Sequence, residues 1–260
     1  MRVAVFSDCH GNAIALEALL ADVEAAGGVD AHWMIGDVAD MGSDPSGCIA
    51  LLRGLDNLVV IRGNADRAVS ESGSAGGRAR ELAAIRSLSD ADALAALMYL
   101  EEAAWTRGAI TQAGIEHLAW LKGLPLESRQ TLSDGTRVLL VHAAPGRDDG
   151  AGPLASHSDD DVRSMLAGCD ADLIFVGHTH TPLDRTVDGI RVINTGSVSN
   201  PVTGDRRAMW TLLDADASGY RVERRFVDYD RDAYLRTLVA VEHPARALIW
   251  HYFGGELVES

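Results

Sequence analysis

Residues 1–37 read MRVAVFSDCHGNAIALEALLADVEAAGGVDAHWMIGD, and this stretch decides the fold class. Two short apolar runs, Val3–Phe6 and His32–Ile35, have the length of buried strands. Between them, from about Asn12 to Ala26, apolar residues recur at the spacing of a buried helical stripe, and Gly27 follows as a helix terminator. The order strand, helix, strand is typical of an α/β fold.

The rest of the chain continues this pattern with one interruption. Further strand-like segments are Leu58–Ile61, Val138–Val141, Leu173–Val176, Arg191–Ile193, Met209–Leu213 and Tyr220–Val227. The region from about 70 to 125 instead begins with Ser and Gly and continues as helical sequence rich in Ala and Leu. We interpret it as a helical insertion or cap on a single domain spanning residues 1–260. The last 30 residues also have a helical pattern, and their aromatic side chains are expected to be exposed for packing or dimerisation.

The composition limits the class of protein. With 260 residues and 47% hydrophobic content, the chain can form one large core. Its longest apolar runs are far shorter than the roughly 20 residues of a membrane span, and the first run meets Asp8 too soon for a signal peptide. Three cysteines without CxxC spacing indicate no disulfide framework. We therefore expect a cytoplasmic protein without a membrane partner.

The net charge of −15 bears on the ligand. Nucleic-acid backbones are held by basic surfaces, so a nucleic-acid polymer is not expected as a partner. A small phosphorylated substrate remains compatible with this charge, because bound metal ions can reverse the local electric field.

Side chains that can bind metal follow five of the predicted strands, each at the point where the strand ends. They are Asp8, His10, Asp37, Asn64, His142, His178 and His180. The carboxyl ends of strands in an open α/β sheet form the edge where ligands bind, and glycines beside these residues allow sharp turns. A single such histidine or aspartate is more often a packed residue, a turn former or a helix cap. The recurrence of such side chains at the ends of five strands favours a shared metal site.

The types of ligand indicate the metal. Imidazoles and carboxylates together suit Mn, Fe, Ni, Co or Zn, whereas Ca or Mg alone rarely recruits so many histidines. Seven ligands are too many for one ion. We therefore predict two divalent metal ions that share a bridging carboxylate.

The order of these motifs resembles the calcineurin-like metallophosphoesterase family over roughly residues 1–213, the helical middle excepted. The matching motifs are Asp8-x-His10, Gly36-Asp37-x-x-Asp40, Gly63-Asn64-x-Asp66, Val141-His142 and Gly177-His178-x-His180. The later segments Asn194-Thr195-Gly196-Ser197-Val198 and Asp205-Arg206-Arg207-Ala208 are similar to small bacterial members. The resemblance implies a four-layer α-β-β-α sandwich of two mixed sheets.

The resemblance also implies roles for individual residues. One metal ion would be bound by Asp8, His10 and His180, the other by Asn64, His142 and His178, with Asp37 as the bridge. Catalysis, in which two ions activate a bridging water for attack on a phosphate ester, would depend on Asp37, Asn64, Asp66 and His142. Asp66 would orient a neighbour rather than bind metal. Asp40 would act in the same way or cap a loop.

Substrate contacts are less sharply indicated. Arg62 and Arg206 are candidates for binding the substrate phosphate, with a structural or surface role as the alternative. Backbone groups of Thr195, Gly196 and Ser197 are expected to shape the pocket. Cys9 lies between two ligands, and strand alternation predicts that it turns away from them into the core.

One position departs from the family pattern. Many members read Gly-Asn-His-Asp, where the histidine can protonate the leaving group, whereas this chain has Ala65. Alanine cannot donate a proton, so a contribution of typically 10²–10⁴-fold is missing or comes from elsewhere. His157 is one candidate donor, and a solvated loop residue is the alternative. A diester with a good leaving group needs an acid least, which favours a phosphodiester as substrate.

Two other functions remain open from the sequence. One is a phosphomonoesterase acting on a protein or a nucleotide. The other is a weakly active, metal-dependent binding or scaffold protein, which Ala65 allows and the full set of seven ligands opposes. The sequence leaves open whether the chain forms a homodimer.

Overall fold

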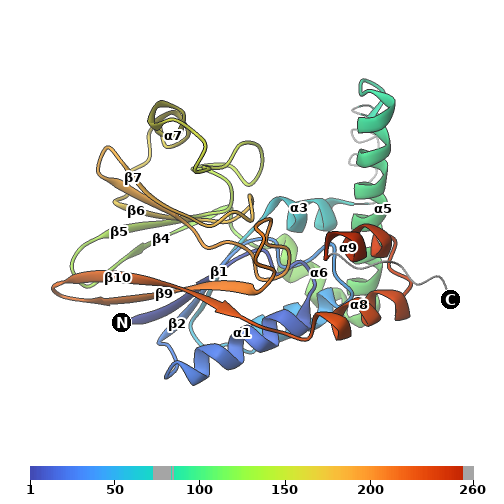
Figure 1. Cartoon of the computed structure of the whole chain (residues 1–260), viewed down its shortest axis with the longest axis horizontal. Coiled ribbons are helices and arrows are strands. Elements are labelled where there is room, and N and C mark those ends of the chain that lie inside the picture. Colours follow the sequence, from blue (N-terminus) through green and yellow to red (C-terminus); the bar gives the residue numbers. More distant parts are fainter. Residues whose placement is uncertain (73–82, 84, 254–260) are drawn as a thin grey trace.

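The computed structural model describes residues 1–72, 83 and 85–253, and it contains two five-stranded sheets (Figure 1). The first sheet is built from β1 (Arg2–Phe6), β2 (Ala31–Ile35), β3 (Leu58–Ile61), β9 (Ala208–Asp216) and β10 (Gly219–Val227). The second is built from β4 (Glu127–Thr131), β5 (Arg137–Val141), β6 (Leu173–Val176), β7 (Leu183–Val187) and β8 (Ile190–Asn194).

Both sheets are mixed. The first has the order β10-β9-β1-β2-β3, with β1, β2 and β3 parallel and β9 antiparallel to β1. The second has the order β4-β5-β6-β8-β7, with β5, β6 and β8 parallel between antiparallel edge strands. The predicted strands are confirmed. The sequence did not predict β4 and β7, because these edge strands are short and mostly polar.

Eight helices surround the sheets in the described part of the chain. They are α1 (Ala13–Ala25), α2 (Pro45–Arg53), α3 (Asn64–Glu71), α5 (Asp90–Ala113), α6 (Ile115–Lys122), α7 (Asp159–Met165), α8 (Arg231–Ala240) and α9 (Arg246–Tyr252). The first begins as predicted, since the Asn12 side-chain oxygen accepts a hydrogen bond from the Ala15 amide at 3.0 Å.

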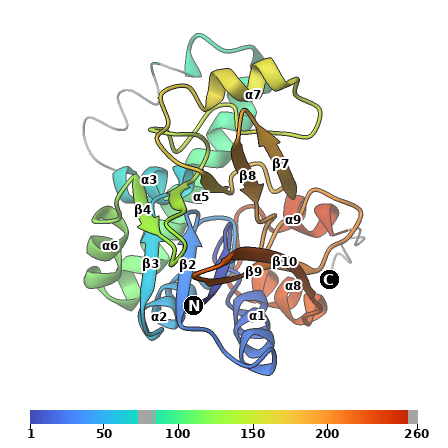
Figure 2. The ribbon, with the colours of Figure 1, turned by 90° about the vertical axis from the view of Figure 1, so that its left-hand side faces the viewer.

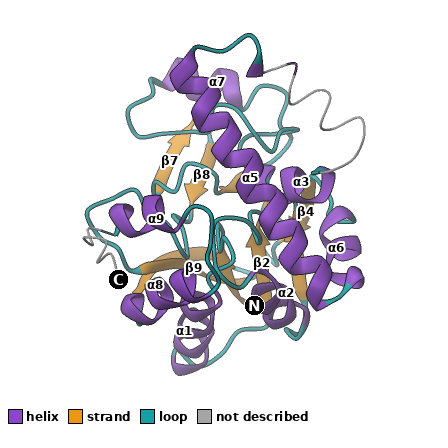
Figure 3. Cartoon of the chain, turned by 90° about the vertical axis from the view of Figure 1, so that its right-hand side faces the viewer, coloured by secondary structure: helices purple, strands orange, loops and turns teal. Residues whose placement is uncertain are grey.

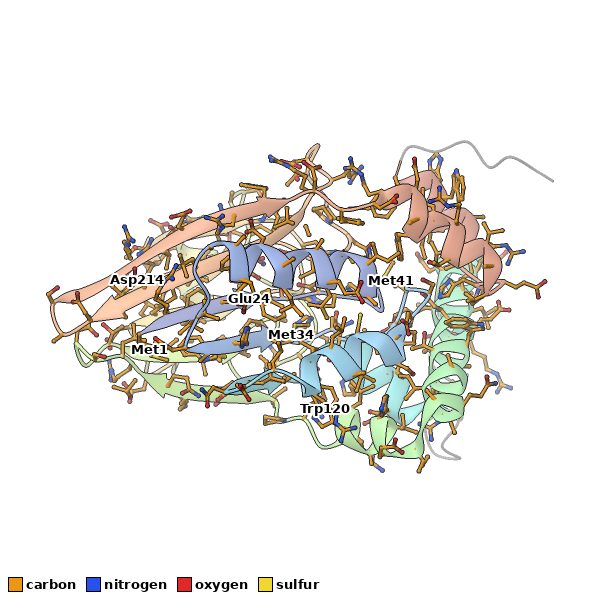
Figure 4. All side chains as sticks on the ribbon, turned by 90° about the horizontal axis from the view of Figure 1, so that it is seen from below. Met1, Glu24, Met34, Met41, Trp120 and Asp214 are labelled. Carbon is orange, nitrogen blue, oxygen red and sulfur yellow. The ribbon has the colours of Figure 1, made fainter. Side chains whose placement is uncertain are left out.

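Alternation along the strands produces the layers. In β1, Val3 and Val5 pack into the core between the two sheets, whereas Ala4 and Phe6 pack toward the helices outside the first sheet. Met34 of β2 belongs to this same outer core (Figure 4). Figure 2 shows α1 outside the first sheet and α7 outside the second. The predicted four-layer α-β-β-α sandwich is confirmed.

Within the described residues, the region interpreted as a cap contributes α5 and α6 at one end of the sandwich. Helices α5 and α6 pack on each other and on α3, and α5 also contacts α2 (Figure 3). The Ser- and Gly-rich stretch that precedes them, residues 73–82 and 84, lies outside the described residues. Across residues 1–72, 83 and 85–253, no helix combines the length and apolarity that crossing a bilayer requires.

The final helices α8 and α9 confirm the predicted helical pattern, but their aromatic residues are packed. Tyr234 is 1% exposed, and its ring contacts that of Phe253 at a centroid distance of 5.9 Å. Trp250 and Tyr252 are half-buried. The aromatic side chains therefore serve packing, one of the two predicted roles, and they are less exposed than expected because Tyr234, Trp250 and Phe253 pack in one cluster with Ile14 of α1.

Candidate metal centre

The structure brings all seven predicted ligands together at the edge where β1, β2, β3, β5 and β6 end. Two groups of three have ligand atoms within 4.8 Å of one another, namely Asp8 with His10 and His180, and Asp8 with Asp37 and His142. Asn64 joins the second group, since its Oδ1 lies 3.2 Å from His142 Nε2 and 2.9 Å from His178 Nδ1. Parallel strands from both sheets thus deliver their ligands to one place.

Two carboxylates lie between the predicted ligand sets. Asp37 Oδ2 is 3.2 Å from His142 Nε2 in one set and 3.7 Å from His10 Nε2 in the other. Asp8 Oδ1 is 3.2 Å from His180 Nε2 and 3.9 Å from His142 Nε2. The position of Asp37 therefore matches the bridging role that the resemblance implied.

The backbone at the site is unusual. Five of the seven ligands have left-handed backbones, with φ between 44° and 66°, and they are Asp8, His10, Asp37, His178 and His180. Such residues cost roughly 1–3 kcal/mol each and persist where the surrounding structure holds them. Here the turns after β1 and β2 bind each other, since the Asp8 amide donates to the Gly36 carbonyl at 3.1 Å and the His10 amide to the Asp37 carbonyl at 3.0 Å.

Glycines allow the turns to approach the ligands. A Cβ atom at Gly63 would lie 2.0 Å from Asp37 Oδ1, and one at Gly177 would lie 2.7 Å from Asp8 Oδ2. Gly36 has φ +80°, and its added Cβ would lie 2.7 Å from His142 Nδ1. These contacts explain why glycines stand beside the ligands in the sequence.

Backbone carbonyls fix the orientation of three ligand imidazoles. His142 Nδ1 lies 2.6 Å from the Ile35 carbonyl, His178 Nε2 lies 2.8 Å from that of Gly150, and His180 Nδ1 lies 2.7 Å from that of Asn200. A carbonyl only accepts, so each of these nitrogens donates its hydrogen. The other ring nitrogen then directs its lone pair at the centre, as in known metal sites.

This donor set fits a divalent cation. His10 Nε2 and His180 Nε2 face each other at 3.1 Å. Two lone pairs directed at each other repel unless a proton or a cation lies between them. The combination of imidazole, carboxylate and amide donors matches Mn, Fe, Ni, Co and Zn.

Burial and neighbouring charges shift the pKa values of the carboxyl and imidazole groups of the site. Burial raises the pKa of a carboxyl, but the neighbouring histidines outweigh burial at Asp8 and at Asp37, and both pKa values are lowered. Burial lowers the pKa of His10 to about 4. At His142 burial acts in the same direction, but the charge and hydrogen bond of Asp37 outweigh it and raise the pKa to about 10. Protons on these imidazoles therefore compete with cations for the same lone pairs.

Asp66 positions Asp37 through the backbone. Its Oδ2 accepts from the amides of Asp37 and Gly63, both at 2.9 Å, and its Oδ1 from those of Val38 at 2.9 Å and Ala39 at 3.1 Å. Burial and the charge of Asp37 raise the pKa of Asp66 to about 7, whereas the amides favour its ionised form. These contacts support the prediction that Asp66 orients a neighbour.

A second pair of buried carboxyls connects the site to the cap. Asp40 is 1% exposed, and neither of its carboxylate oxygens has a hydrogen-bond partner among the described residues. Its role in orienting a neighbour or capping a loop stays a prediction. Glu102 of α5 is 5% exposed. Burial and then the charge of Glu102 raise the pKa of Asp40 well above its usual value, and burial raises the pKa of Glu102 to about 7.

Replacing Glu102 is expected to stabilise the protein at alkaline pH. Because the folded pKa exceeds the ordinary value of 4.5, the stability contributed by Glu102 is complete below pH 4.5 and is lost as pH rises through 7. This loss is up to about 3 kcal/mol. Glu102→Gln should therefore raise the melting temperature by about 5 °C at pH 8 and much less at pH 5. The exposed neighbour Glu101, changed to Gln, is the control, and equal shifts in both variants would contradict the prediction.

The two arginines predicted to bind substrate are engaged in other contacts. Arg62 holds Asp148, with Nε and Nη2 at 2.9 and 2.8 Å from Oδ2. Arg206 donates to the Pro201 carbonyl at 2.7 Å and lies 4.3 Å from the centre of the Tyr252 ring. Binding of substrate phosphate by Arg62 and Arg206 stays a prediction.

The end of β8 and the segment after it make hydrogen bonds to the loops that carry the predicted ligands. The Asn194 amide group donates to the Gly177 carbonyl at 2.6 Å, Thr195 Oγ1 lies 2.8 Å from Ser7 Oγ, and Ser197 Oγ donates to the Asp8 carbonyl at 3.0 Å. Thr195 and Ser197 are fully buried. These contacts therefore join this segment to the ends of β1 and β6, and a role of its backbone groups in shaping the pocket stays a prediction. Cys9 packs in the core, as predicted.

Ala65 is buried, and a tyrosine of the cap interacts with its neighbour Asn64. Ala65 is 1% exposed, and its amide donates to Asp37 Oδ1 at 2.8 Å. The Tyr99 phenol of α5 interacts with the Asn64 side chain, and burial, Asp40 and Asp37 raise its pKa, so it stays protonated. Nothing in the local sequence around Tyr99 indicated a role at the site, because this residue comes from the cap. His157 instead accepts from the Leu154 amide at 3.2 Å.

Comparison with known proteins agrees with this geometry. The family described as "Calcineurin-like phosphoesterase superfamily domain" matches residues 1–218. The uncharacterized protein MJ0912 of Methanocaldococcus jannaschii is 29% identical over 243 residues, 88% of each chain. The crystal structure of a metallophosphoesterase from Sphaerobacter thermophilus is similar with a TM-score of 0.73 and 28% identity, covering 98% of this chain and 99% of that one. The hypothetical protein PH1004 from Pyrococcus horikoshii OT3 shares the fold, with a TM-score of 0.79, 19% identity and the same coverage.

Proposed function

The chain belongs to the calcineurin-like phosphoesterase superfamily and is a metal-dependent phosphoesterase, and from this premise we propose that it hydrolyses a phosphodiester at a centre of two divalent metal ions. The observation that carries the proposal is the pair of ligand groups that meet around Asp8 and Asp37. One group alone would complete a single site, whereas seven converging donors with a carboxylate between them suit two ions.

Some residues of the site would bind the metal ions, and others orient the residues that bind them. Two divalent cations, when bound here, would lower the pKa of a coordinated water and neutralise the charge of the phosphoryl group. Asp8, His10 and His180 would hold one of them, and Asn64, His142 and His178 the other, with Asp37 shared. Asp66 fixes the backbone of Asp37, and the carbonyls of Ile35, Gly150 and Asn200 keep the imidazoles turned toward the centre.

The preference for a diester follows from the available proton donors. Ala65, at the position where many family members have a histidine, brings none. A monoester with a poor leaving group needs a strong general acid, whereas a diester with a good leaving group does not. A small phosphorylated molecule is the proposed partner. A phosphomonoesterase and a metal-dependent scaffold are the alternatives.

Two chromogenic esters test this proposal. Protein loaded with Mn²⁺ should hydrolyse bis(p-nitrophenyl) phosphate with a kcat/KM at least tenfold above that for p-nitrophenyl phosphate, and chelation should abolish both reactions. The metal content of the protein, measured by mass spectrometry, should approach two ions per chain. A faster monoester reaction would overturn the diester assignment, and metal-loaded protein without turnover of either ester would favour the scaffold.

A further inference from the structure

An apolar groove leads away from the metal centre between α5 and α9, and we call it the α5–α9 groove. It consists of two hollows of about 250 and 470 Å³ that share Met41 and Leu248. Figure 3 shows α5 and α9 on either side of the loops that follow the strands, and Figure 4 places Met41 where these loops meet the helices. The larger hollow is within the usual size of a small-molecule site.

The smaller hollow is lined by a residue of the metal centre, and the larger one by a residue that interacts with it. The smaller one is lined by His180, a predicted ligand, and by Asn200, whose carbonyl accepts from that imidazole at 2.7 Å. The larger one is lined by Tyr99, whose phenol interacts with the ligand Asn64. A molecule with its phosphate at the centre would therefore extend its organic group into the groove.

The side chains that line the two hollows indicate which kind of organic group would bind there. Val202, Leu248, Ile249 and Tyr252 line the smaller hollow, and Met98 is among the apolar residues of the larger one. Among the described residues that line either hollow, none is Arg or Lys, and the larger hollow has the acidic Glu101 and Glu102. A second phosphate or another anion would be repelled there. An uncharged apolar group would instead be removed from water.

We propose that the α5–α9 groove binds the non-reacting organic group of the substrate, and that this group is an uncharged alkyl chain or aryl ring esterified to the phosphate. The inference rests on the proposed function, because it assumes that the metal centre holds the phosphate. It adds the substrate class, an amphiphilic phosphate ester. Val202 and Leu248 remain 54% and 53% exposed, so a bound apolar group has surface left to cover.

A matched pair of diesters tests the groove. Methyl p-nitrophenyl phosphate and n-hexyl p-nitrophenyl phosphate have the same leaving group and differ only in the group that the groove would bind. For Mn²⁺-loaded protein we expect kcat/KM to be at least tenfold higher for the hexyl ester. In Leu248→Gln this ratio should fall toward one. Leu94→Gln is the matched control, since Leu94 lies on α5, is 61% exposed and lines neither hollow.

Binding gives a second readout that does not require turnover. Titration calorimetry should give n-hexyl phosphate a Kd at least tenfold below that of methyl phosphate, and Leu248→Gln should remove this difference. If both diesters are hydrolysed at equal kcat/KM, the groove does not bind the substrate, although the proposed function stands. If neither is hydrolysed but hexyl phosphate binds more tightly, the proposed function fails while the groove assignment holds.

A dimer is the competing use of the same surface. Light scattering of the wild type and of Leu248→Gln decides between the two. A dimer that dissociates in the variant, together with an unchanged ratio of hexyl to methyl turnover, would make the groove an interface between copies of this chain and would overturn the proposal.

Discussion

Asp37→Asn is expected to lower metal-dependent phosphodiester hydrolysis by about 10³-fold or more. Asp37 Oδ2 lies 3.2 Å from His142 Nε2 and 3.7 Å from His10 Nε2, so it reaches members of both ligand sets. An amide of the same shape has no charge and only one accepting atom, and it cannot bind two cations as a carboxylate does. The measurement is kcat/KM for bis(p-nitrophenyl) phosphate with added Mn²⁺, together with metal content, which should fall below that of the wild type.

The control for this prediction is a carboxylate away from the centre. Asp56 is exposed in the turn before β3, and Asp56→Asn should keep wild-type activity and metal content. Circular dichroism of both variants checks that the fold is retained. Full metal-dependent turnover in Asp37→Asn would show that the bridging role is wrong.

Gly63→Ala is expected to lower activity by at least a hundredfold and stability by about 2–3 kcal/mol. The added methyl carbon would lie 2.0 Å from Asp37 Oδ1 and 2.4 Å from the Asp37 amide nitrogen. Gly63 has φ −96°, which alanine adopts freely, so the effect is a collision and not backbone strain. Asp37 or the turn before α3 must move, and the ligand geometry is lost with it.

Gly108 offers a matched substitution. It lies within α5, and a methyl group added there meets no atom within 4 Å among those described. Gly108→Ala should leave activity unchanged and raise the free energy of unfolding by up to about 1 kcal/mol, because alanine is the better helix former. The two variants are compared by urea unfolding and by diester turnover. Wild-type activity in Gly63→Ala would mean that the turns are less tightly packed around Asp37 than the structure shows.

Much of the site followed from the sequence because each ligand is marked locally. An apolar run of strand length followed by a metal-capable side chain identifies one contribution to the sheet edge, and Asp8, Asp37, Asn64, His142 and His178 each follow such a run. The role of Asp66 was also predicted, whereas its four amide donors were visible only in the structure.

The buried strands, the α1 helix and the seven candidate ligands were predictable from the amino-acid sequence, because burial and strand ends leave periodic patterns in neighbouring residues. The residues that face the centre from other elements became visible only in the folded protein. Tyr99, which interacts with Asn64, belongs to a helix whose own pattern carries no sign of a site, and the carbonyls that orient the imidazoles belong to Ile35, Gly150 and Asn200. Such contacts depend on how the two sheets and the cap pack together. Contacts between residues that are far apart in the sequence cannot be predicted from the residues next to either partner.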